Sequence, residues 1–224
     1  NRDIYVMPAS GGEARLLTPD TFDALDAAPV WSPDSRTVAF ISDRNGWNNL
    51  GVIDVGTGET QMLLEEPVEH SEPRWSPNGK WISFTKNLDY HYHLFRLPAD
   101  GGTAEKITTM DGVNGGSSAT GQTRGDHRWH PNGREIVTTH SDPSRTGDLW
   151  ILPVAGGAAR QITNHQAKAL RDPGLFVWPE LIEYRSFDGL EVAGAVLGFA
   201  DTEDLQDDAA VGVEDVDGRP AAHP

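Results

Sequence analysis

The sequence predicts an all-β fold, a partial β-propeller of about three and a half four-stranded antiparallel blades, from three observations. A tryptophan, a proline turn and an alternating apolar run follow one another three times along the chain. The tryptophans of these copies, Trp31, Trp75 and Trp129, stand 44 and 54 positions apart, close to the roughly 40–45 residues of a propeller blade. Turn signals separate further short strand-like runs in each copy. Because one such unit cannot bury both of its faces, the copies are expected to stack on one another.

Each tryptophan is followed by residues that suit a type I turn. Proline presets the second position of such a turn, Asn or Asp suits the third, and Gly tolerates the exit. The residues of this repeat motif are Trp31, Pro33 and Asp34 in the first copy, Trp75, Pro77, Asn78 and Gly79 in the second, and Trp129, Pro131, Asn132 and Gly133 in the third.

The strand after each turn carries apolar residues on both faces. In the first copy, Val38 and Phe40 fall on one face, and Ala39 and Ile41 on the other. Both faces are therefore expected to be covered, as in a sheet packed between two others. The tryptophans are interpreted as packing between blades, except Trp47, which lies in a polar turn.

These patterns divide the chain into segments. We expect the last two strands of a blade at 1–20, blades at 26–66, 69–108 and 125–163, a Gly/Ser loop at 109–124, a linker at 164–178, a strand, an Asp-Gly turn and a second strand within 179–199, and an acidic tail at 200–224. The first blade lacks two strands and the chain begins with Asn1. We therefore expect a fragment of a longer protein.

The first copy and its surroundings, residues 29–44, with weaker copies at 73–86 and 127–140, resemble the PD40 (WD40-like) propeller repeat. TolB proteins and the propellers of the prolyl oligopeptidase (S9) family of serine peptidases share this repeat. The resemblance covers residues 1–163. Residues 178–197 are similar to the segment with which acylaminoacyl-peptidase-like and dipeptidyl-peptidase-like members leave the propeller and begin their α/β-hydrolase domain.

The resemblance implies the non-catalytic propeller portion of an S9 peptidase, which gates and positions peptides for a catalytic domain. The chain departs from that family after Leu197, because no Gly-x-Ser-x-Gly nucleophile motif or preceding His-Gly-Gly segment occurs in it. Nucleophile, base and oxyanion donors must be positioned together, so we assign no catalytic residue and expect no peptidase activity from this chain alone. The alternative is a TolB-like or free-standing protein-binding propeller without chemistry.

Two charged pairs stand at matching positions before a repeat tryptophan. Glu72 and Arg74 precede Trp75 as Asp126 and Arg128 precede Trp129, and residues two apart project from one face of a strand. In a propeller the innermost strands border the central channel, where such charges would select what passes. The commoner interpretation is structural ion pairing between blades, which contributes modestly where water reaches it.

Histidines do not form a recognisable metal motif. His91 and His93 alternate onto one strand face, whereas His127 and His130 have an odd separation. A metal site needs its full ligand set, so we predict no metal and no cofactor.

Composition limits the partners. The net charge of −16 argues against nucleic acid, which requires basic patches, and no apolar run approaches the roughly 18 residues of a membrane helix. The absence of cysteine mildly favours the cytoplasm, although a truncated start would hide a signal peptide. The acidic, lysine-poor composition resembles that of halophilic proteins, so we expect stability to rise with salt.

The expected partners are peptide substrates, through the missing hydrolase domain, and other protein surfaces. About three and a half blades cannot close the ring of roughly seven that the resemblance implies. We therefore expect association through the open blade faces.

Overall fold

A computed structural model describes residues 2–18, 25–88, 91–115, 126–166 and 179–196. The chain forms two compact units, residues 1–171 and 172–224, which are described separately. Every element in the described residues is a β-strand, which confirms the predicted all-β fold. The predicted acidic tail lies outside the described residues, as do most of the 164–178 linker and positions 116–124 of the Gly/Ser loop.

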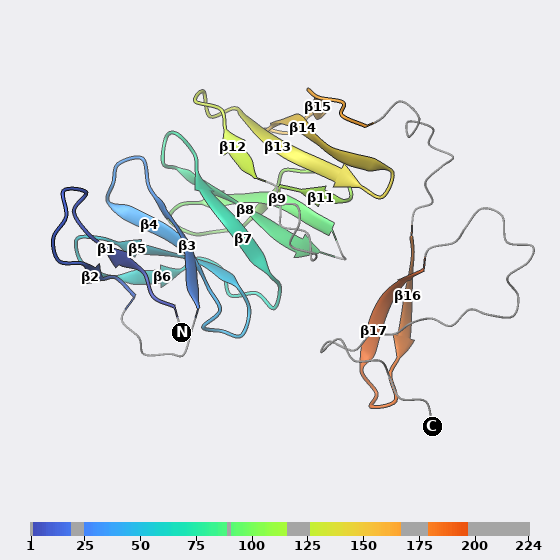
Figure 1. Cartoon of the computed structure of the whole chain (residues 1–224), viewed down its shortest axis with the longest axis horizontal. Helices are drawn as coiled ribbons and strands as arrows, with labels where there is room; N and C mark the ends of the chain where they lie inside the picture. Colours follow the sequence, from blue (N-terminus) through green and yellow to red (C-terminus); the bar gives the residue numbers. More distant parts are fainter. Residues whose placement is uncertain (1, 19–24, 89–90, 116–125, 167–178, 197–224) are drawn as a thin grey trace, which may run out of the picture. The chain divides into compact units, whose positions relative to one another are not determined.

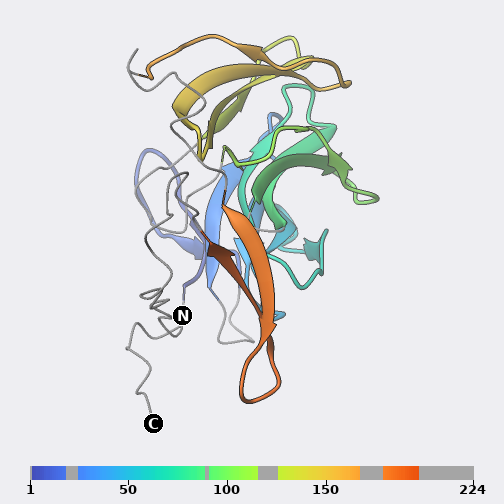
Figure 2. The same ribbon diagram turned by 90° about the vertical axis from the view of Figure 1, so that its right-hand side faces the viewer.

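The first unit contains a two-stranded, a four-stranded and a nine-stranded sheet in chain order, and the nine-stranded sheet comprises two blades joined by a short strand (Figures 1 and 2). A two-stranded sheet, β1 and β2, comes first, and three four-stranded blades follow it. The strands of the sheet and of the first blade are β1 (Tyr5–Val6), β2 (Arg15–Leu16), β3 (Asp26–Trp31), β4 (Thr37–Ser42), β5 (Asn49–Asp54) and β6 (Thr60–Met62). Those of the second and third blades are β7 (His70–Trp75), β8 (Trp81–Leu88), β9 (His91–Pro98), β10 (Glu105–Lys106), β12 (His127–Trp129), β13 (Glu135–Asp142), β14 (Arg145–Pro153) and β15 (Arg160–Gln161).

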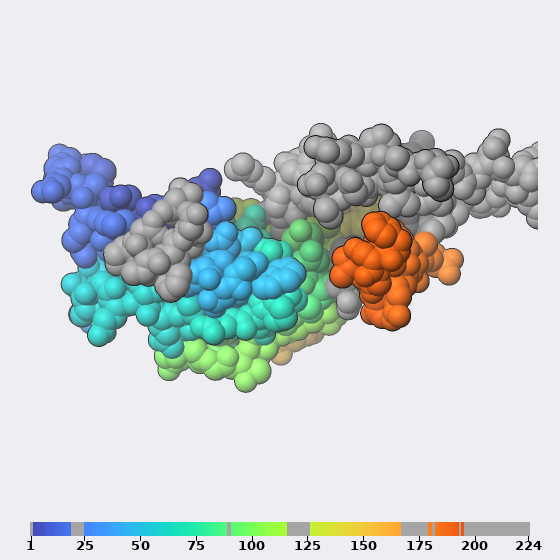
Figure 3. Space-filling model, turned by 90° about the horizontal axis from the view of Figure 1, so that it is seen from below, coloured from blue at the N-terminus to red at the C-terminus, as the bar shows by residue number. Residues whose placement is uncertain are grey.

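Apolar side chains fill the seams between consecutive sheets. Val38 and Phe40 of β4 pack with Ile4 and Leu17 of the first sheet, whereas Ile41 on the opposite face of β4 packs into the seam with the second blade. A third cluster joins the second and third blades around Leu94, Ile136, Leu152 and Val154. Alternation along the middle strands thus buries both of their faces, as the sequence predicts. The space-filling view shows the blue, cyan and green layers in direct contact (Figure 3).

In the second and third blades, the repeat tryptophan forms a hydrogen bond to the preceding blade. The indole Nε1–H of Trp75 donates to the Val30 carbonyl at 3.0 Å, and that of Trp129 donates to Ser83 Oγ at 2.8 Å. Trp31 differs, because the residue is 47% exposed. The part of the preceding sheet that the structure describes has two strands, β1 and β2, and they leave Trp31 more exposed to solvent than the preceding blades leave Trp75 and Trp129. Trp47 is also exposed, as expected from its polar turn.

An additional strand, β11 (Val113–Asn114), joins the second and third blades. It runs parallel to β9 at Tyr92 and antiparallel to β13 at His140. The fully buried Asn114 side chain donates to the carbonyls of Tyr92 and Met110 and contacts His140 Nδ1 at 2.9 Å. This strand lies within residues 109–124, where the sequence predicts only a loop. A strand of two residues is too short to show an alternating pattern, and its pairing depends on partners that are distant in the sequence.

The second unit contains a β-hairpin, β16 (Glu180–Arg185) and β17 (Glu191–Val196). Its turn closes through the Ser186 N–H and the Leu190 carbonyl at 2.8 Å, with Gly189 at a φ of 87°. Phe187 at this turn is fully exposed. Among the described residues of either unit, the structure contains no helix with the length and apolar character needed to cross a membrane.

In the first two blades the repeat motif closes the turn between the first two strands with the same hydrogen bonds, whereas in the third blade His130 Nδ1 stands in for the serine hydroxyl and accepts the Asn132 N–H at 3.2 Å. In the first blade the Ser35 N–H donates to the Ser32 carbonyl at 2.9 Å, and Asp34 Oδ1 accepts from Ser32 Oγ at 2.6 Å and from the Arg36 N–H at 3.1 Å. The exit residue has a positive φ, 60° at Ser35 and 69° at Gly79. Only glycine adopts this region without strain.

The exit position generates the first prediction. Replacing Ser35 by Gly should raise the free energy of unfolding by about 0.5–1 kcal/mol, because relief of left-handed strain exceeds the entropy that glycine adds to the unfolded chain. Urea unfolding followed by tryptophan fluorescence measures the change.

The matched control is Gly79→Ser in the second blade. A Cβ there would meet only Pro33 Cδ at 3.8 Å, so a loss of stability would come from backbone strain, less the smaller unfolded-state entropy of serine, and not from a steric clash. The loss should be about 1 kcal/mol. A destabilised Ser35→Gly variant would contradict this account of the turn.

Candidate functional site

The candidate site lies where the first strands of the three blades come together. Strand β7 contacts both β3 and β12, and these are the edge strands of their blades. The four charged residues that the sequence singles out, Glu72, Arg74, Asp126 and Arg128, belong to β7, to β12 and to the position just before β12. The edge-strand positions therefore bring charges from different blades together.

A β-bulge changes how Glu72 and Arg74 are presented. The pairing of β7 with β8 shifts register between Ser71 and Arg74, and Glu72 has a φ of 54°. The expectation that Glu72 and Arg74 project together from one face of a regular strand is wrong, because a bulge interrupts the alternation and redirects the side chain. Strand β3 has the same irregularity at Ala28, whose φ is 50°.

Asp126 is the centre of the ion-pair cluster. Its Oδ1 lies 3.0 Å from Arg74 Nη2 in the second blade, and its Oδ2 lies 2.7 Å from Arg128 Nη2. Oδ1 also accepts the His127 backbone N–H at 2.8 Å. The Arg74–Asp126 pair therefore bridges two blades, as the structural interpretation in the sequence analysis expects. The Arg128 side chain is 61% exposed, so its own pairing contributes little stability.

His127 anchors the cluster from within the protein. Its ring is fully buried, and its Nε2 lies 2.8 Å from Ser83 Oγ on the second blade. The Ser83 hydroxyl also accepts the indole N–H of Trp129 and lies 3.2 Å from the Arg74 carbonyl. Burial, with the Arg74 charge as the next cause, lowers the pKa of His127 to about 3. The imidazole is therefore neutral at physiological pH.

The roles of Ser83 and His127 are not predicted from the sequence. There His127 is considered only as a metal ligand, together with His130, and Ser83 carries no predicted role. One signal was available, since Ser83 is a small polar residue at a strand position that Ala39 occupies in the first blade. The other partner, 44 positions away, is not visible in any local pattern.

One group of potential metal ligands occurs among the described residues. Ligand atoms of Glu72, Asp126 and His127 lie within 4.8 Å of one another. However, both oxygens of Asp126 already pair with guanidinium groups, and these two positive charges oppose a further cation. The donor set therefore fits an ion-pair cluster better than a metal centre.

Comparison with known proteins places this arrangement in a family. The model of the TolB β-propeller domain, PD40, matches residues 1–127. The chain belongs to this family. The recognition of the PD40 repeat from the sequence is thereby confirmed.

Two curated relatives and one solved structure show the range of proteins that resemble this chain. It is 28% identical over 105 residues to the uncharacterized protein Atu1656 of Agrobacterium fabrum, covering 47% of this chain and 35% of that protein. It is 28% identical over 140 residues to the uncharacterized peptidase YuxL of Bacillus subtilis, covering 62% of this chain and 18% of that protein. The dipeptidyl peptidase 4 of Porphyromonas gingivalis has a similar fold, with a TM-score of 0.63 at 13% identity over 82% of this chain and 26% of that one. The chain thus spans about a third or less of the curated relatives it matches.

The buried imidazole gives a prediction for pH. The pKa of His127 is about 3 in the folded protein, below its ordinary value of 6.5, so the unfolded chain binds the proton first. Its contribution to stability is complete above pH 6.5 and is lost as the pH falls towards 3. From pH 7.5 to pH 5 the loss should be about 2 kcal/mol.

Replacing His127 by Gln should remove that part of the pH dependence. Urea unfolding of both proteins at the two pH values gives the comparison. His70 and His140, whose pKa values burial also lowers, contribute equally to both proteins and cancel. Equal losses of stability in the two proteins would show that His127 is not buried in its neutral form.

Proposed function

We propose that this chain is the non-catalytic propeller portion of an S9-type serine peptidase, where it gates and positions peptides for a catalytic domain. One observation carries the proposal: charged side chains from two blades gather on the edge strands β7 and β12. In a propeller the innermost strands border the central channel, and a charged channel lining acts on passing ligands at long range. The similarity to YuxL, whose name describes a peptidase, and the β16–β17 hairpin after the blades support this proposal.

The charges of the cluster are not equivalent in this role. Asp126 is paired with two guanidinium groups, which leaves little net charge at that carboxylate. Arg128 remains largely exposed, so its guanidinium is accessible to a passing peptide. A peptide with a free carboxylate or an acidic side chain is therefore the kind of molecule that Arg128 would attract.

The family match favours a second candidate, a TolB-like protein-binding propeller without enzymatic activity. The matched model is the TolB propeller domain itself, and it covers 127 residues of this chain. In this alternative the charged edge strands would contact a protein partner. Propellers support many functions, so the fold does not decide between the two.

The test uses the product of the complete gene. If the proposal holds, that product hydrolyses short chromogenic peptides, and Arg128→Gln lowers kcat/KM for acidic peptides about three- to tenfold relative to neutral ones. Labelling of the active-site serine by a fluorophosphonate should stay unchanged, because the small probe does not depend on charge at the channel.

The control variant is Arg185→Gln, which removes an exposed guanidinium from the β16–β17 hairpin. It should leave the ratio of acidic to neutral peptides unchanged. A gene product that neither hydrolyses peptides nor reacts with the fluorophosphonate would overturn the peptidase proposal in favour of the binding module. An active product with an unaltered peptide ratio in Arg128→Gln would overturn the gating role.

A further inference from the structure

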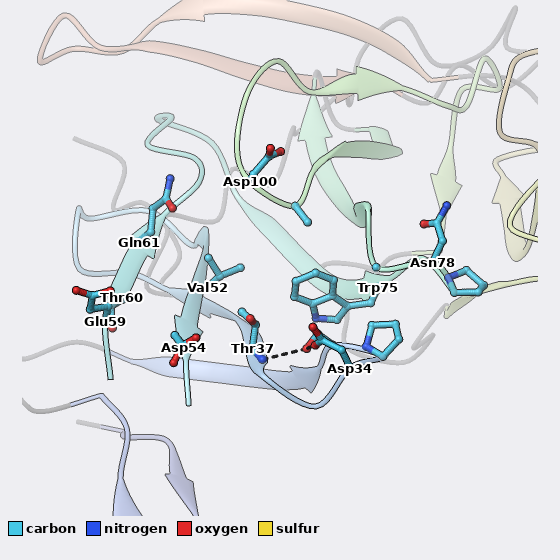
Figure 4. A pocket seen from close by; sticks show the side chains of 15 residues that line it. Asp34, Thr37, Val52, Asp54, Glu59, Thr60, Gln61, Trp75, Asn78 and Asp100 are labelled. Carbon is cyan, nitrogen blue, oxygen red and sulfur yellow. Dashed lines mark hydrogen bonds between the residues drawn. The ribbon is translucent and has the colours of Figure 1, made fainter. Parts of the chain in front are cut away.

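A groove runs along the seam between the first and second blades, on the side of their first turns. Its volume is about 950 Å³, which is in the range of sites for small ligands and short peptide segments. Val52 and Trp75 provide apolar surface, and Asp54, Glu59 and Asp100 present carboxylates around it (Figure 4). None of the described residues that line the groove is lysine or arginine.

The next seam shows why this one is open. Strand pairing shows which positions of the two blades are equivalent. In the first blade Val52 pairs with Ala39 and Gln61. In the second blade Arg96 pairs with Ser83 and Glu105, so Arg96 holds the position of Val52.

In the second blade these positions are filled by larger side chains. The Arg96 guanidinium lies 4.3 Å from the centre of the Trp81 ring, and its Nη2 lies 2.7 Å from Glu105 Oε2. Trp81 corresponds to Thr37 of the first blade, because each begins the second strand of its blade. The small side chains of Thr37 and Val52 therefore leave space where the second blade holds a stacked arginine.

The charges around the groove favour a cation. Hydrogen bonds from Ser32 and from the Thr57 backbone lower the pKa values of Asp34 and Asp54 respectively, so both stay ionised well below neutral pH. Arg36 is near enough to contribute to both shifts, but it lines a separate hollow with Asp54. Glu59 and Asp100 add two exposed carboxylates.

We propose that this groove docks an arginine-bearing peptide segment of a partner protein. The methylenes of the arginine lie against Val52 and Trp75, and its guanidinium pairs with a carboxylate at the groove's margin, that of Asp100 on one side or of Asp54 or Glu59 on the other. The chain itself supplies the precedent, since Arg96 occupies the equivalent place in the next blade. Arginine fits better than lysine, because a guanidinium stacks on aromatic rings, pairs with carboxylates in a planar fork and is less strongly hydrated. This inference is independent of the proposed peptidase function.

The experiment measures binding of a fluorescein-labelled Gly-Arg-Ala-Arg-Gly peptide to the full chain by fluorescence anisotropy at low and moderate salt. Versions with lysine and with uncharged citrulline in place of arginine are measured in parallel. We expect the arginine peptide to bind at least about threefold more tightly than the lysine peptide and at least about tenfold more tightly than the citrulline peptide. Equal affinity for arginine and either substitute, or no binding by the arginine peptide, would overturn the proposal.

The decisive variant transfers the second blade's residues into the groove, as Thr37→Trp, Val52→Arg and Gln61→Glu together. Val52→Arg adds a positive charge and Gln61→Glu adds a negative one, so the net charge of the protein stays the same. The nonspecific electrostatic attraction between the acidic protein and the cationic peptide is therefore preserved. Binding of the arginine peptide should weaken at least about tenfold. Unchanged affinity in this variant, with an unaltered circular dichroism melting curve, would show that the peptide binds elsewhere.

A second pair of variants covers the case in which the triple variant does not fold. Glu59→Gln with Asp100→Asn removes two carboxylates from the groove, and Glu13→Gln with Asp111→Asn removes two exposed carboxylates that do not line it. The first pair should weaken arginine-peptide binding several-fold more than the second. Equal effects of the two pairs would mean that only total charge matters, and would overturn the groove as the binding site.

Discussion

The structure depends on burial of both faces of the middle strands of each blade. Phe40 packs towards the sheet before it and Ile41 towards the blade after it, so neither face can be exposed without loss of a seam. Burial of large apolar side chains is the dominant favourable contribution to folding. The hydrogen bonds of Trp75 and Trp129 to the preceding blades then fix how each blade meets its neighbour.

Local features of this architecture could be predicted from the sequence, whereas features that depend on distant partners could not. The turn after each tryptophan is set by neighbouring residues such as Pro33 and Asp34, so its position and its type can be predicted from the local sequence. The alternation of Val38 to Ile41 likewise predicts two covered faces. Strand β11 could not be predicted, because Asn114 is held by Tyr92 and His140 from two other strands.

The candidate site shows the same division. The matching positions of Glu72, Arg74, Asp126 and Arg128 relative to the tryptophans are visible in the sequence, and they indicate that the residues belong to equivalent strands. The bulge at Glu72 is not visible, and neither is the contact of the His127 ring with Ser83, because no local pattern links positions 44 apart. Comparison of equivalent positions between blades is what reveals the groove, since Thr37 and Val52 matter only in contrast to Trp81 and Arg96.

Because neighbouring blades share their buried seams, we expect the first and second blades to unfold together as one cooperative unit. Native-state hydrogen exchange of the paired backbone amides in β4, β5, β8 and β9 measures this cooperativity. The most protected amides of the two blades should exchange with the same free energy and respond equally to low concentrations of denaturant. Exchange from β4 and β5 at a free energy several kcal/mol below that of β8 and β9 would show instead that each blade folds without its neighbour.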